Sequence, residues 1–80
     1  MRPPKVIKFR EFQKLLRRYD IKLLPGRRHN LFVSPEGIKY PVPFSKPGED
    51  VERAYVNAAR RAFSLTPEDG VSDREFYQRK

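Results

Sequence analysis

The chain has 80 residues, a length that predicts one domain spanning 1–80 with a modest hydrophobic core. It contains no cysteine, which excludes disulfide bonds, zinc–thiolate sites and thiol nucleophiles. It has no apolar run of membrane-spanning length and no signal-peptide pattern at its start, so we expect no membrane association and a cytoplasmic location.

The net charge of +8 is concentrated in one half of the chain. Residues 1–46 contain 12 Lys and Arg against three Asp and Glu, a net of +9, whereas residues 47–80 contain six against seven, a net of −1. A basic half of this kind attracts nucleic acid, an acidic protein or anionic lipid. The alternative interpretation is a charged surface that only keeps the protein in solution.

The first predicted element is an amphipathic helix over residues 8–19. Apolar side chains recur in it at steps of three and four, which is the spacing of one buried helical face. Asp20 interrupts this period and predicts the end of the helix. The side chains expected to face the core are Phe9, Phe12, Leu15, Leu16 and Tyr19.

Three short strands joined by turns are expected next, at about 21–24, 29–33 and 38–44. Pro25-Gly26 marks the first turn, and Ser34-Pro35-Glu36-Gly37 marks the second, where glycine can adopt a positive φ. Two prolines in the third strand cannot donate sheet hydrogen bonds, so at least part of this strand should lie at a sheet edge.

A second helix is predicted at about 51–63. Acidic residues precede it and Arg60-Arg61 stand near its end, as the helix dipole favours. Thr66-Pro67 indicates a cap followed by proline at the first helical position, and Ser72–Glu75 is a capping box that opens a short terminal helix. The narrow stripe expected to face the sheet is Val51, Tyr55, Ala58 and Ala62.

The element order is therefore αβββα with a short extra C-terminal helix, which places the chain in the α+β class. A three-stranded antiparallel sheet with both helices on one face would bury each apolar stripe. This layout is the sandwich of the double-stranded-RNA-binding-domain (dsRBD) type. We expect a core at about 8–65 and a C-terminal extension at 66–80.

His29 is the only histidine, and two arginines stand immediately before it. An imidazole can transfer a proton near neutral pH, and fixed positive charge beside it suits a phosphodiester substrate. A structural or solvated histidine is the alternative, with Arg27 and Arg28 forming an ordinary phosphate-binding patch or a solvated loop. One histidine and scattered carboxylates offer no metal-ligand cluster.

The run from Arg28 to Pro43 resembles the HicA toxins, the YcfA-like family of small mRNA interferases. The resemblance covers about residues 8–65. Three features fall into register: His29 on the family's catalytic histidine, Pro35-Glu36-Gly37 on its turn, and Val42-Pro43 on the end of its third strand. The chain departs from the family pattern in having Arg27 and Arg28 in place of a glycine and a small residue, and Ser45 where a second histidine is often found.

The resemblance implies metal-independent cleavage of mRNA, with His29 as the acid/base and no cofactor. Candidate RNA contacts are Arg27, Arg28 and Lys39. If regular strand geometry holds, Arg27 shares a face with His29 and Arg28 does not, while the side on which Lys39 points depends on the register.

The family also implies a type II toxin–antitoxin system with a HicB-like antitoxin protein, and an acidic antitoxin would complement the basic half. A second hypothesis is a non-catalytic RNA-binding module on the same fold, which recognises A-form shape. A third is a partner-binding adaptor with no role in nucleic-acid binding.

Overall fold

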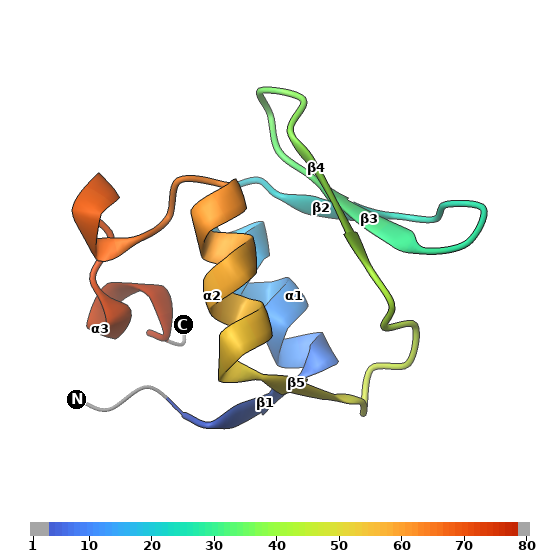
Figure 1. The fold of residues 1–80 in the computed structure, drawn as a ribbon, viewed down its shortest axis with the longest axis horizontal. Coiled ribbons are helices and arrows are strands. Elements are labelled where there is room, and N and C mark those ends of the chain that lie inside the picture. The colour runs from blue at the N-terminus through green and yellow to red at the C-terminus, as the bar shows by residue number, and fades with distance from the viewer. Residues whose placement is uncertain (1–3, 79–80) are drawn as a thin grey trace.

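The computed structural model describes residues 4–78 as a small α+β domain (Figure 1). Its elements, in chain order, are β1 (Val6–Lys8), α1 (Phe9–Arg17), β2 (Lys22–Leu24), β3 (Asn30–Val33), β4 (Lys39–Val42), β5 (Asp50–Glu52), α2 (Arg53–Ala62), the 3-10 turn η1 (Pro67–Asp69) and α3 (Asp73–Phe76). None of the helices in this described part of the chain is long and apolar enough to span a bilayer.

The expected three-stranded antiparallel sheet is confirmed, with β3 in the centre between β2 and β4. The register sets Leu23 beside Phe32 and Phe32 beside Tyr40, so these three side chains share one face. Phe32 meets Phe9 and Phe12 of α1, and Tyr40 meets aromatic rings of α2 and its C-terminal cap. Both long helices therefore pack against the same face of the sheet, as predicted.

A second, two-stranded antiparallel sheet was not predicted from the sequence. It pairs β1 with β5, and Lys8 Nζ lies 2.6 Å from Asp50 Oδ1 across the pair. Each strand leads directly into a helix, β1 into α1 and β5 into α2 (Figure 1). The pair therefore fixes the starts of both helices side by side. Ile7 and Val51, one from each strand, are buried in the hydrophobic core.

The α1 helix buries the predicted stripe of Phe9, Phe12, Leu15 and Leu16. It ends where Asp20 takes the left-handed conformation at φ 60°, which short polar side chains tolerate better than most. The Ile21 N–H then donates to the Leu16 carbonyl at 3.2 Å and turns the chain toward β2.

The buried face of α2 differs from the predicted stripe. Val56, Ala59 and Arg60 are buried in α2, whereas Ala58 and Ala62 are only half-buried. The prediction counted Val51 as part of the helix, but Val51 belongs to β5 and its side chain follows strand geometry. The predicted stripe is therefore displaced by one residue from the helix face that is buried in the structure.

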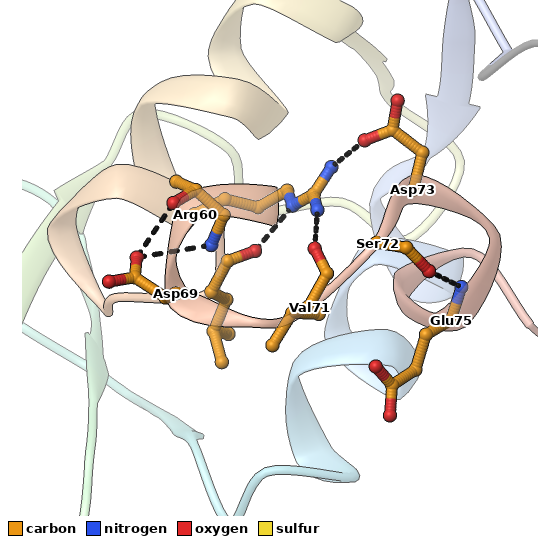
Figure 2. Close-up of polar contacts among 8 residues, drawn as sticks. Arg60, Asp69, Val71, Ser72, Asp73 and Glu75 are labelled. Carbon is orange, nitrogen blue, oxygen red and sulfur yellow. Dashed lines mark hydrogen bonds and ion pairs between the residues drawn. The ribbon is translucent and has the colours of Figure 1, made fainter.

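The C-terminal segment folds back onto the two long helices, and Arg60 is the main polar contact (Figure 2). This guanidinium is 2% exposed and donates to the Leu65 carbonyl, the Val71 carbonyl and the Asp73 carboxylate at 2.6 to 2.8 Å. Its charge also lies 4.5 Å from the centre of the Phe76 ring. We refer to Arg60 with these four partners as the Arg60 clamp.

Local caps and a second arginine complete the docking of this segment. Thr66 and Asp69 form a reciprocal capping box around η1, and the Ser72 hydroxyl accepts the Glu75 N–H at 3.1 Å (Figure 2). Arg18, just after α1, donates to backbone carbonyls at the end of α3, including that of Glu75. The predicted cap at Thr66 is therefore present, and of the predicted capping box at Ser72–Glu75 the hydrogen bond from the Glu75 N–H to Ser72 is present.

Candidate functional site

His29 lies in the exposed loop 25–29 that joins β2 to β3 (Figure 1). The prediction that the strand begins at His29 is wrong by one residue, because β3 begins at Asn30. Residues 27–29 form a bend, so the strand-face argument that paired Arg27 with His29 does not apply. The imidazole is exposed, and no hydrogen bond or ion pair joins it to another residue within 4–78.

Gly26 sets the shape of this loop by close approach. A Cβ atom at this position would lie 2.2 Å from the His29 carbonyl oxygen, closer than any real Cβ contact. Because the obstacle is backbone, a side chain at position 26 would force the loop to move. Gly26 therefore constrains the backbone at the position that His29 occupies.

Asn30 fastens the loop to the segment that follows β4. Its side-chain Nδ2 donates to the Phe44 carbonyl at 3.1 Å, and it does so from the inner face of the sheet, next to Val42 in register. Phe44 is itself packed against Phe9 of α1 at a ring distance of 5.5 Å. This hydrogen bond joins the residue after His29 to a ring-packed residue at the edge of the core.

Glu49 organises the neighbouring segment, residues 45–49. One of its carboxylate oxygens accepts the N–H groups of Ser45 and Lys46 at 2.8 and 2.9 Å. These backbone hydrogen bonds lower the pKa of the Glu49 carboxyl below 4.5, and the one from Lys46 has the larger effect. The backbone carbonyl of Glu49 in turn accepts the first N–H of α1, from Phe9, at 2.8 Å.

The basic candidates divide into two places. Arg27 and Arg28 are exposed in the same loop as His29. Lys39 pairs with Val33 at the opposite end of β3, roughly 10 Å along the strand from Asn30, and it points to the face away from the helices. The structure thus brings together three of the four predicted site residues and sets Lys39 apart from them.

The stretch of chain around the loop carries no negative charge. Residues 21–35 contain no Asp or Glu, and the two arginines of the loop are the basic residues beside His29, whereas Lys22 pairs with Val33 at the opposite end of β3. Within residues 4–78, no three His, Asp or Glu side chains gather in a way that could hold a metal ion. The loop therefore offers an accessible proton-transfer group beside two fixed cations, which suits contact with a phosphate.

Sequence reasoning missed three residues that shape the loop and the segment 45–49. Gly26 was interpreted only as a turn former, Asn30 was not singled out, and Glu49 was only one of the acidic residues that precede the second helix. Asn30 follows directly after the histidine, where a side-chain amide can bridge to backbone across a loop, but its partner Phe44 is 14 residues away. Only the fold reveals that contact.

No protein-family model, curated protein or solved structure matches this chain. The resemblance to HicA toxins therefore rests on the residues of this sequence alone, and the geometry of loop 25–29 is the main guide to function.

Proposed function

We propose that this protein is a toxin of a type II toxin–antitoxin system that cleaves mRNA without a metal ion, with His29 as the acid/base. The observation that carries the proposal is the exposed loop 25–29. Its imidazole has no hydrogen-bond or ion-pair partner among residues 4–78 and lies beside Arg27 and Arg28 in a stretch without carboxylates. The resemblance of residues 28–43 to the HicA family supports it.

The chemistry uses a nucleophile that RNA itself carries. His29 takes the proton of a ribose 2′-OH, and the 2′ oxygen attacks the adjacent phosphorus as the bond to the 5′ oxygen breaks. The products are a 2′,3′-cyclic phosphate and a 5′-hydroxyl, which takes up a proton. Arg27 and Arg28 stabilise the negative charge that develops on the phosphate oxygens.

The same proposal includes the fold relationship and the partner. The three-stranded sheet with α1 and α2 on one face supports a dsRBD-like sandwich, to which β1, β5 and α3 are additions. A HicB-like antitoxin with an acidic surface would cover the loop and neutralise residues 1–46. We expect the toxin and this partner to act in the cytoplasm.

The test is incubation of purified protein with RNA in EDTA, comparing wild type with His29→Ala and with Arg61→Ala. Arg61 is exposed on α2, so its variant controls for the loss of one surface charge. We expect cleavage by wild type and Arg61→Ala and none by His29→Ala. Cleavage by His29→Ala at the wild-type rate would overturn the assignment of the acid/base.

A non-catalytic RNA-binding module is the second candidate, favoured by one observation. No side chain or backbone group in residues 4–78 orients the His29 imidazole, whereas catalytic histidines are commonly held by a hydrogen bond to the second ring nitrogen. Under this alternative, wild type and His29→Ala bind RNA equally, with affinity that falls steeply as salt rises, and neither cuts it.

A further inference from the structure

A pocket of about 300 Å³ lies on the side of the molecule where the segment after β4 passes the start of α2. Two aromatic rings form part of its wall, those of Phe44 and Tyr55, which meet edge to face at a centroid distance of 5.0 Å. Burial is the main cause that raises the pKa of the Tyr55 phenol above its ordinary value. The remaining lining residues are Asp50, Glu52 and Ala54.

The two carboxylates of the pocket differ in what they already bind. Asp50 and Glu52 are two residues apart in β5, so both project to the face opposite the buried Val51. Asp50 is held by Lys8 at 2.6 Å. Glu52 is exposed, makes no side-chain cap to α2, and has no hydrogen-bond or ion-pair partner within 4–78. Glu52 is therefore the acceptor that a ligand can use.

The pocket is connected to the proposed catalytic loop through Phe44. Phe44 lines the pocket, and its backbone carbonyl accepts the hydrogen bond from Asn30, the residue after His29. This connection is the reason for asking whether an RNA strand with a phosphate at His29 sets another of its bases against Phe44 and Tyr55. Stacking of unpaired bases on aromatic side chains is the usual way in which proteins hold single-stranded RNA.

We infer that this pocket binds an unpaired guanine of the RNA, with Glu52 accepting hydrogen bonds from its N1–H and exocyclic N2–H groups. The inference rests on the proposed function and adds a sequence preference to it. A carboxylate only accepts hydrogen bonds, and guanine is the base that presents two adjacent donors on its Watson–Crick edge. Adenine and cytosine place a ring-nitrogen lone pair beside their amino group, and uracil places its N3–H between two carbonyls.

The experiment measures binding without cleavage, so that it is independent of the activity of His29. Fluorescence anisotropy is recorded with 2′-O-methyl pentanucleotides of uridine in which the central base is guanine, hypoxanthine, adenine or uracil. We expect guanine to bind about tenfold more tightly than hypoxanthine, which lacks the N2 amine, and more tightly than adenine or uracil.

Two variants on the same strand assign the preference to one side chain. Glu52→Gln should abolish the advantage of guanine while leaving the binding of the uridine oligonucleotide unchanged or slightly stronger. Asp50→Asn, the matched control, should keep the advantage because Asp50 is already paired with Lys8. Equal affinity for all four oligonucleotides, or a guanine preference that survives Glu52→Gln, would overturn the inference.

These outcomes also separate this inference from the proposed function. RNA cleavage that depends on His29 but shows no guanine preference in binding would overturn the pocket assignment alone. A guanine preference that depends on Glu52, in a protein that cuts no RNA, would support the pocket and leave the non-catalytic RNA-binding module as the function.

Discussion

The chain contains the dipeptide Arg-Arg three times, and two of the copies end in opposite environments. Arg27 and Arg28 are both exposed in loop 25–29. In the Arg-Arg dipeptide at positions 60 and 61, Arg60 is 2% exposed and holds the C-terminal segment through the Arg60 clamp, whereas Arg61 is exposed. An arginine becomes structural where backbone carbonyls and a carboxylate converge on it, and it stays available for a ligand where they do not.

The difference also separates stability from function in this molecule. The clamp joins α2 to the residues before and within α3, next to the aromatic rings of Phe76 and Tyr77. Loop 25–29 is exposed, and Asn30, the residue that follows it, is joined to Phe44 by a hydrogen bond. Substitutions in the clamp should therefore act on folding. Substitutions of the exposed side chains of the loop should act on RNA, whereas Gly26 is constrained by the backbone and should affect both.

Arg60→Ala has the largest expected effect on stability. It leaves the Leu65 and Val71 carbonyls without this donor and removes the cation from Asp73, so the free energy of unfolding should fall by about 3 kcal/mol. Arg61→Ala, at the exposed neighbour, should change it by less than about 0.5 kcal/mol. Urea denaturation measures both, and equal stability of the two variants would contradict the clamp.

Gly26→Ala should have the next largest effect, because the new Cβ collides with the His29 carbonyl. We expect a decrease of about 2 kcal/mol in unfolding free energy, with RNA affinity also reduced as the loop moves. Gly48→Ala is the matched control, since nothing lies within 4 Å of a Cβ there and its φ is not positive. If both variants have wild-type stability, the close approach at Gly26 does not constrain the loop.

Glu49 gives a smaller effect that depends on pH. Its pKa is lowered on folding by hydrogen bonds from Lys46 and Ser45, so its stabilisation is fully present above pH 4.5 and disappears as pH falls below this value through the folded-state pKa. Glu49→Gln should therefore be less stable than wild type at pH 7, and the difference should shrink toward pH 3. Thermal unfolding across this range tests it, and a difference that stays constant would contradict the role of the ionised carboxylate.

Arg27→Ala and Arg28→Ala should have the smallest effect on stability, within about 0.5 kcal/mol, because both side chains are exposed. Each should weaken RNA binding and make the slope of log affinity against log salt shallower by about 0.7, the value for one phosphate of a single strand that is no longer neutralised. Titrations at several salt concentrations measure this slope. An unchanged slope in both variants would remove the two arginines from the RNA interface.

The sequence predicts best where structure is local. The buried stripe of α1, the positive φ of Gly37 at 89° and the caps at Thr66 and Ser72 all follow from residues within one or two turns of each other. The pairing of β1 with β5 joins residues more than 40 positions apart through strands of three residues each, too short for a periodic pattern. The burial of Arg60 was not predictable for a similar reason, because its hydrogen-bond partners lie outside α2, between residues 65 and 73.

The candidate site was predictable in composition but not in geometry. The proximity of Arg27 and Arg28 to His29 follows from their adjacency in the chain. The position of Lys39 at the far end of β3 depends on the strand register, and the bend at 27–29 depends on the approach of Gly26 to the His29 carbonyl. The hydrogen bond from Asn30 to Phe44, which links the loop to the guanine pocket, requires the tertiary fold.

The chemical identity of the RNA ends after a single turnover in EDTA decides whether His29 is the acid/base of a metal-independent cleavage. We expect a 2′,3′-cyclic phosphate and a 5′-hydroxyl with the wild-type protein. We expect no product with His29→Ala, although that variant should bind a 2′-O-methyl RNA as tightly as wild type does. Products of the same kind and at the same rate from His29→Ala, or no cleavage by wild type of any RNA sequence containing guanine, would contradict this role of His29.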